Sequence, residues 1–163
     1  MIPSPKIRGG VKDSAATLIN LSHSQSKERL ERQKSIATVL PNPMQKVLKS
    51  GAGWRIGWNP ANIYQGLVGG DDWAFELTAA ELADFCRLLG QLVANVRSIE
   101  TELMDEESIA CEAESDLVWM QLAGIRGKYG LRLILNTGRS CEGNWDVDAV
   151  AELITAVDSL KFF

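Results

Sequence analysis

Two stretches of the chain present the same features in the same order. Residues 71–89 (DDWAFELTAAELADFCRLL) and residues 143–160 (GNWDVDAVAELITAVDSL) each begin with a strand-like segment that contains a tryptophan. A helix-capping residue, a Glu-Leu pair and an amphipathic pattern follow in both. A helix with a single apolar stripe must bury that stripe against another layer of structure. The repeat therefore predicts two similar units, each ending in a helix that covers a sheet.

The first helix has the clearest pattern in the chain. Thr78 is a good N-cap, and Glu81 three residues later completes a capping box. Apolar residues then recur at spacings of three and four, and the acidic residues 105–107 end the pattern. The predicted stripe consists of Leu82, Phe85, Cys86, Leu89, Leu92, Val93, Val96, Ile99 and Leu103.

The second helix closes the chain. Either Asp146 or Asp148 is its expected cap, because both aspartates precede the apolar pattern. Its predicted stripe consists of Val150, Leu153, Ile154, Val157 and Leu160.

Alternation of apolar and polar residues predicts strands ahead of each helix. Before the first helix these strands are residues 54–58, 64–68 and 73–77, and residues 44–50 lead into them. Before the second helix they are residues 109–114, 117–122, 129–135 and 141–145. The fold class that follows is α+β, with two β-meander-plus-helix units (ββββα-like, duplicated). Two helices are expected to cover curved antiparallel sheets.

The charge changes along the chain. Residues 1–43 contain seven of the 17 basic side chains and three of the 21 acidic ones. Residues 44–163 therefore contain 10 basic and 18 acidic side chains. The first part is Ser-rich and carries four of the five prolines, which is typical of a disordered tail. It fits either an organellar transit segment or a non-native extension before Met44. We expect residues 44–163 to form a single α+β domain.

The residue types narrow the possible chemistry. The three cysteines are widely spaced and odd in number, which favours free thiols over a disulfide framework. The single histidine is His23, so a zinc site of the usual Cys/His type and a His-dependent triad are not expected after residue 43. No apolar run is long enough for a transmembrane helix. We expect no enzyme activity, no metal and no cofactor.

Four long segments resemble a known family. They read LKSGAGWRIGWNP, YQGLVGGDDWAFELTAAELADFCRLL, ELMDEESIACEAESDLVWMQLAG and LRLILNTGRSCEGNWDVDAVAEL. From about Met44 to Leu160 the chain resembles domain of unknown function 1818, an uncharacterised family of cyanobacteria and photosynthetic eukaryotes. The resemblance implies a fold similar to Whirly-type single-stranded DNA-binding transcriptional regulators. It implies no established activity and no catalytic residues. It implies a location in the cyanobacterial cytoplasm or the plastid stroma.

An acidic segment between residues 100 and 116 carries eight carboxylates and no basic residue. It fits a solvated helix end and outer strand face, a docking surface for a basic protein, or a divalent cation site. Hard cations need several converging oxygens, and the segment has no loop of the D-x-D-x-D-G type. The candidate partner surface consists of Glu107, Glu112, Glu114 and Asp116.

Aromatic and basic residues suggest a second kind of site. Trp73, Trp119 and Trp145 are expected in the core, whereas Trp54 and Trp58, beside Arg55, could stack bases at the surface. Candidate anion or nucleic-acid contacts are Arg55, Arg126, Lys128, Arg132, Arg139, Trp54 and Trp58. For the four later basic residues, we favour the interpretation that they offset carboxylates on neighbouring strands.

These observations favour a non-catalytic interaction or regulatory protein that binds a protein partner. The alternative is a single-stranded nucleic-acid-binding transcriptional regulator. The 18 acidic side chains after residue 43 disfavour that alternative, because nucleic-acid binding depends on cationic contacts. The sequence does not indicate an oligomeric state.

Overall fold

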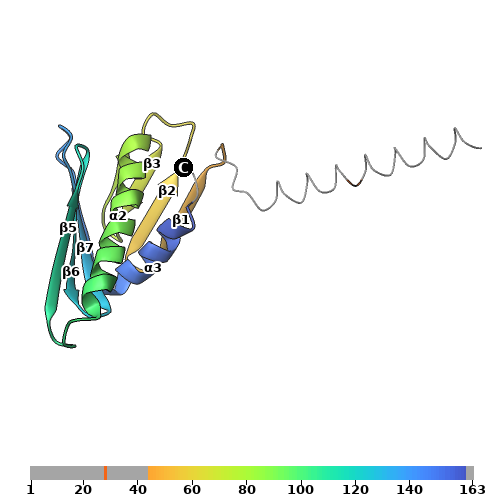
Figure 1. Ribbon diagram of the computed structural model, residues 1–163. Helices are drawn as coiled ribbons and strands as arrows, with labels where there is room; N and C mark the ends of the chain where they lie inside the picture. Colours follow the sequence, from red (N-terminus) through yellow and green to blue (C-terminus); the bar gives the residue numbers. More distant parts are fainter. Residues whose placement is uncertain (1–27, 29–43, 161–163) are drawn as a thin grey trace, which may run out of the picture. The chain divides into compact units, whose positions relative to one another are not determined.

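The computed structural model describes residue 28 and residues 44–160 of the chain. The strands before the first helix pair in chain order as one antiparallel sheet, which we call sheet A (Figure 1). Its strands are β1 Val47–Gly51, β2 Trp54–Trp58, β3 Gly66–Gly69 and β4 Ala74–Leu77. The expected disordered tail of residues 1–43 lies outside the described residues, apart from residue 28.

A second antiparallel sheet, sheet B, lies between the two helices in the chain and also pairs in chain order. Its strands are β5 Ser108–Glu114, β6 Val118–Ile125, β7 Lys128–Leu135 and β8 Glu142–Trp145. The helices are α2 Ala79–Glu100 and α3 Val147–Asp158. The order of elements is therefore ββββα repeated twice, which confirms the predicted α+β fold class.

The start of α2 follows from its capping box. The Thr78 hydroxyl accepts a hydrogen bond from the Glu81 N–H, and the Glu81 carboxylate accepts one from the Thr78 N–H. The helix ends at Glu100 with Thr101 as C-cap, so Leu103, the last residue of the predicted stripe, lies three residues beyond the helix. Leu103 still packs against the core from the turn that follows. At α3, Asp146 is the N-cap.

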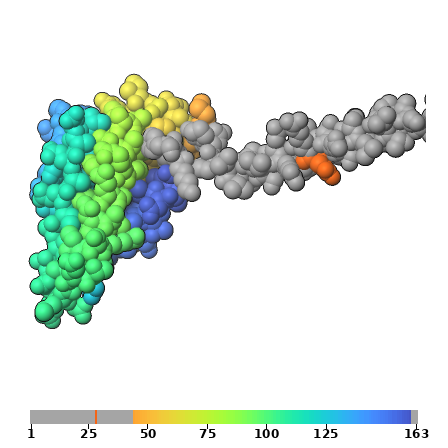
Figure 2. All heavy atoms as spheres, viewed as in Figure 1, coloured from red at the N-terminus to blue at the C-terminus, as the bar shows by residue number. Residues whose placement is uncertain are grey.

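Both helices lie between the inner faces of the two sheets (Figure 1). Helix α2 packs on β5 and β6 of sheet B and on β3 and β4 of sheet A, while α3 packs on β7, β1 and β2. The outer side of α2 remains visible between the sheets (Figure 2, green). Neither helix is long and apolar enough to cross a membrane, within the residues described.

Aromatic side chains join the sheets at one place. The rings of Trp73 and Trp145 meet edge to face with centroids 4.9 Å apart, and Phe85 of α2 packs on Trp145 at 5.9 Å. Trp73 can lie flat on β8 only because residue 143 is glycine, since a Cβ there would come within 2.2 Å of the Trp73 ring. The predicted core position of Trp145 is confirmed.

Two details of the sequence reading are wrong. β1 was not recognised as a strand, because only Val47 and Lys49 of its five residues are even half-buried and no apolar alternation marks it. Trp119 does not belong to the core. The alternation of β6 turns Val118 and Met120 inward, so the residue between them must face outward.

Candidate functional site

The outer face of sheet B is the side turned away from the helices. The strand register aligns its side chains in two rows that each cross all four strands. One row is Glu112, Gln121, Arg132 and Asn144, and the other is Glu114, Trp119, Ile134 and Glu142. The face thus combines an aromatic and an aliphatic centre with carboxylates at both edges.

Arg132 contacts both an aromatic ring and a carboxylate in the middle of this face. Its guanidinium lies 5.8 Å from the centroid of the Trp119 ring and 2.5 Å from a carboxylate oxygen of Glu142. In the same row, the Gln121 amide donates a hydrogen bond of 2.9 Å to Glu112. Trp119 is half-buried, so one side of its ring stays open to solvent. These contacts hold the side chains in place without covering the face.

The four carboxylates of the candidate partner surface lie along one edge of sheet B. Glu112 and Glu114 point outward from the edge strand β5 and are exposed. Glu107 precedes this strand and Asp116 lies in the turn after it, and both are exposed. Charged side chains on an edge strand also oppose unwanted pairing with other strands, which accounts for part of their placement. The four residues therefore lie along the same edge of the sheet.

The acidic segment, residues 100–116, lies wholly within the described residues and does not form a metal site. Within the described part of the chain, no three His, Cys, Asp or Glu residues are placed to hold a metal ion.

The later basic residues do not form a cluster. Arg126 and Lys128 lie at the β6–β7 turn, at one end of sheet B, and Arg139 follows the opposite end of β7. Arg126 pairs with Asp105 at 3.0 Å, whereas Lys128, exposed like Arg126, forms no ion pair within the described residues. The possible shared anion patch is therefore not formed. Three of the four pair with carboxylates, as the favoured interpretation of these residues expected.

The two tryptophans proposed to stack bases are buried. Trp54 and Trp58 are each 8% exposed, because the alternation of β2 turns them inward with Ile56. The indole N–H of Trp54 donates a 3.0 Å hydrogen bond to Glu152 of α3. Arg55 points to the other side, where its Nη2 lies 3.4 Å from the carbonyl oxygens of residues 71 and 73. Both rings therefore belong to the core, and the possibility that they stack bases at the surface is wrong.

Glu81, at the start of α2, does more than cap the helix. The sequence predicted its capping role but not its buried ion pair. Glu81 is 2% exposed and forms an ion pair with Arg139 from the β7–β8 loop, while the Thr137 hydroxyl donates to it at 3.2 Å. Burial alone would raise the pKa of Glu81, but the Thr78 N–H, the Arg139 guanidinium and the Thr137 hydroxyl lower it overall. Arg139 also lies over the Tyr64 ring, 4.6 Å from its centroid. This cluster ties sheet A, α2 and sheet B together.

A second polar contact closes the other end of α2. The Tyr129 hydroxyl donates to the Glu100 carboxylate, which also accepts a hydrogen bond of 3.2 Å from the Gly127 N–H. Burial and this hydrogen bond raise the pKa of Tyr129 to about 12, and the same two donors lower that of Glu100. A cavity of about 310 Å³ lies beside this pair, between α2, α3 and sheet B.

The half-buried thiol of Cys86 has no sign of nucleophilic character. Burial, followed by the nearby Asp158 carboxylate, raises its pKa to about 12. A thiol with this pKa stays protonated at neutral pH, so it acts as an apolar packing group.

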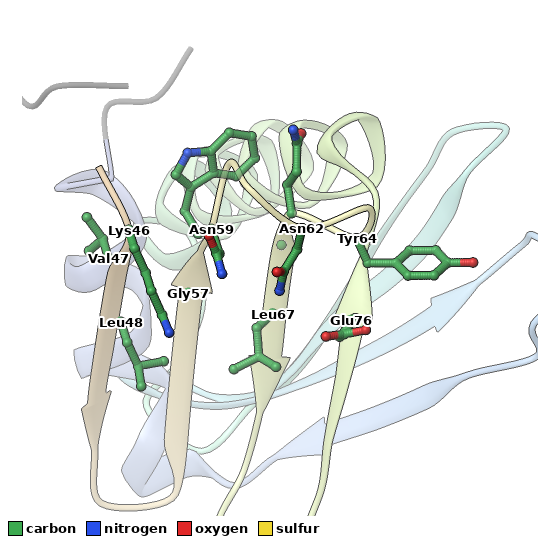
Figure 3. A pocket seen from close by; sticks show the side chains of 12 residues that line it. Lys46, Val47, Leu48, Gly57, Asn59, Asn62, Tyr64, Leu67 and Glu76 are labelled. Carbon is green, nitrogen blue, oxygen red and sulfur yellow. The ribbon is translucent and has the colours of Figure 1, made fainter. Parts of the chain in front are cut away.

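The outer face of sheet A holds a shallow cavity of about 180 Å³ (Figure 3). One row of the register forms its floor, namely Leu48, Gly57, Leu67 and Glu76 from β1 to β4. Gly57 leaves room for the Leu48 side chain, because a Cβ at this position would lie 3.1 Å from it. Lys46 extends over the floor from the β1 edge, and Glu76 closes the opposite side (Figure 3). Sequence reasoning assigned no role to this face.

Comparisons with known proteins agree with this fold. A solved structure of a protein with unknown function from Prochlorococcus sp. NATL2A, described as a member of the DUF155 family, superposes with a TM-score of 0.68. It shares 28% sequence identity, and the match covers 71% of this chain and 98% of that chain. No curated protein matches the sequence. The family of the domain of unknown function DUF1818 matches residues 49–160, so the chain belongs to the DUF1818 family.

Proposed function

We propose that this protein is a non-catalytic protein-binding module and that its partner docks on the outer face of sheet B. The observation that carries the proposal is the half-buried Trp119 beneath the guanidinium of Arg132, in the middle of an open sheet face. Tryptophan and arginine dominate the binding energy of protein interfaces far more often than other residue types. A ring of polar groups surrounds this pair, as at the rim of typical interfaces.

The negative charge at the β5 edge of this face favours a partner with a basic surface. Arg132 is already paired with Glu142, so Glu112, Glu114 and the flanking Asp116 supply the unbalanced charge at the β5 edge. A partner with lysine or arginine side chains opposite this edge would be attracted over the range of the Debye length, about 8–10 Å. We therefore assign the partner to proteins with a basic binding surface.

The same features make a nucleic acid the weaker candidate. Trp54 and Trp58 are buried, and Arg126, Arg132 and Arg139 already pair with carboxylates. The carboxylates on the outer face of sheet B would repel a phosphate backbone.

The cyanobacterial origin of the similar structure supports action in the cytoplasm of a cyanobacterium, and the plastid stroma is the corresponding compartment in a photosynthetic eukaryote.

A quantitative pull-down from native extract tests the proposal. The tagged full chain is compared with the variant Glu112→Lys/Glu114→Lys and with Trp119→Ala. A matched control, Asp72→Lys/Glu102→Lys, makes the same change in net charge at exposed positions outside sheet B. We expect one stoichiometric protein that both face variants lose and that the control retains. Raising the salt from about 50 to 500 mM should weaken its capture, because the charges involved are exposed.

Two results would contradict the proposal. One is a partner that is retained by both face variants, because the binding surface would then lie elsewhere. The other is the same loss in the control variant, because net charge rather than this face would then govern capture. Circular dichroism of each variant ensures that a loss of binding does not reflect a loss of folding.

A further inference from the structure

The outer face of sheet A differs in charge from the rest of residues 44–163. The charged residues on this face are Arg55 and Glu76, at outward strand positions, and Lys46, which precedes β1. By contrast, residues 44–163 as a whole contain 18 acidic side chains. Leu48 is 60% exposed on this face, and Leu67 is half-buried. A face that is apolar in the middle and nearly balanced in charge can approach a copy of itself without strong repulsion.

We propose that this face docks on the same face of a second copy of the chain and forms a weak symmetric dimer. The cavity over Gly57 supplies the shape for this contact. Gly57 and Leu67 are directly opposite each other on the two central strands and both line the cavity, the first without a side chain and the second with a leucine side chain. A two-fold axis parallel to the strands and midway between β2 and β3 places each Leu67 over the Gly57 of the other copy.

The same axis pairs the charges. It places β1 of one copy opposite β4 of the other, so Leu48 of one copy lies over Glu76 of the other. Lys46, two residues before Leu48 on the same face, is then about 7 Å along the strand from that carboxylate, within reach of its side chain, and this pair occurs twice in the dimer. Within the described residues neither side chain forms an ion pair. An axis perpendicular to the strands and through the row of Gly57 and Leu67 would instead place each strand on its own copy and Glu76 against Glu76. Charge therefore selects the first axis.

The size of the face predicts a weak dimer. Four strands about 4.8 Å apart and five residues at about 3.3 Å each span about 19 by 17 Å. This is well below the roughly 800 Å² per partner of standard stable interfaces. We expect a dissociation constant of about 10–100 μM, as for transient contacts.

Sedimentation equilibrium of the full chain between about 5 and 500 μM tests the dimer. Lys46→Glu places carboxylates against each other at both charge pairs, and Glu76→Lys places ammonium groups there. Each variant alone should weaken dimerisation at least about tenfold. An equimolar mixture of the two variants should restore it, because every charge pair in the mixed dimer is then of opposite sign. Lys128→Glu and Glu102→Lys, exposed and outside this face, should leave dimerisation unchanged.

The mixture decides the question. A monomer up to 500 μM would overturn the proposal, as would a dimer that both single variants leave intact. Failure of the mixed variants to associate, with each variant folded by circular dichroism, would also overturn it. The last outcome would mean that Lys46 and Glu76 contact something else, such as another segment of the same chain.

Discussion

The indole nitrogen of Trp145 donates a hydrogen bond of 2.8 Å to the backbone carbonyl oxygen of Gly69. The donor lies at the end of β8 and the acceptor at the end of β3, so this buried bond links sheet B directly to sheet A. Both residues are buried, and water cannot replace the bond if it is lost. Trp145 therefore contributes directly to the relative position of the two sheets, together with the Glu81–Arg139 cluster.

Replacing Trp145 by phenylalanine should destabilise the fold. The ring contacts to Trp73 and Phe85 would be kept in part, but the Gly69 carbonyl would lose its partner, at a cost of about 1–3 kcal/mol in the free energy of unfolding. Urea denaturation measures the change. The matched control is Trp119→Phe, which removes an indole from the open face of sheet B and should change stability by less than about 0.5 kcal/mol. Equal effects at the two positions would contradict the assigned core.

The ion pair between Arg139 and Glu81 should make stability depend on pH. The folded-state pKa of Glu81 is below its usual value, so the pair stabilises the fold above about pH 4.5, and this contribution is lost as the pH falls through the folded-state pKa. Arg139→Ala should lower the free energy of unfolding by about 1.5–3 kcal/mol at pH 7. The difference from the native chain should shrink at pH 3.

Arg132→Ala is the control for this measurement. It removes the Glu142 pair, whose side chains are both exposed to more than 40%, so the change should be under about 1 kcal/mol. A difference between Arg139→Ala and the native chain that stays constant from pH 7 to pH 3 would show that Glu81 does not carry the effect.

Leu89 tests the packing of α2 between the sheets. It is 1% exposed in the middle of the apolar stripe, so Leu89→Ala should cost about 2–5 kcal/mol. The control is Gln91→Ala on the exposed side of the same helix, for which we expect less than about 0.5 kcal/mol. An unchanged urea midpoint for Leu89→Ala would mean that the stripe does not face the core.

Nucleic-acid binding by residues 44–163 should be weak. Fluorescence anisotropy with a labelled single-stranded oligonucleotide at about 50 mM salt should show no saturation below about 10 μM, because the exposed carboxylates repel phosphates. Micromolar binding with a steep dependence on salt would reverse the preference for a protein partner.

Local patterns in the sequence predicted most of the fold. The capping box at Thr78, the stripe through Leu89 and the alternation in β6 and β7 depend on residues close in the chain, and each appears in the structure. β1 was missed because backbone pairing with β2, rather than apolar alternation, defines that strand. A pattern of this kind leaves no signal in a single sequence.

The sites were harder to predict because they depend on contacts between distant residues. Glu81 was recognised as a cap, but its pairing with Arg139 depends on how the β7–β8 loop folds over α2. The orientation of Trp54, Trp58 and Trp119 follows from the phase of each strand relative to the helices, and alternation alone does not say which phase faces inward. The line of carboxylates along β5 was found because it is contiguous in the sequence.

Site-specific photocrosslinking tests the central claim most directly. A photoreactive benzoylphenylalanine replaces Gln121 on the outer face of sheet B, or Gln91 on the exposed side of α2 as the control. After irradiation in native extract, we expect one discrete protein adduct from position 121 that is absent from position 91 and is lost with Glu112→Lys/Glu114→Lys. No adduct from position 121, or the same adduct from both positions, would contradict a partner-binding role for this face.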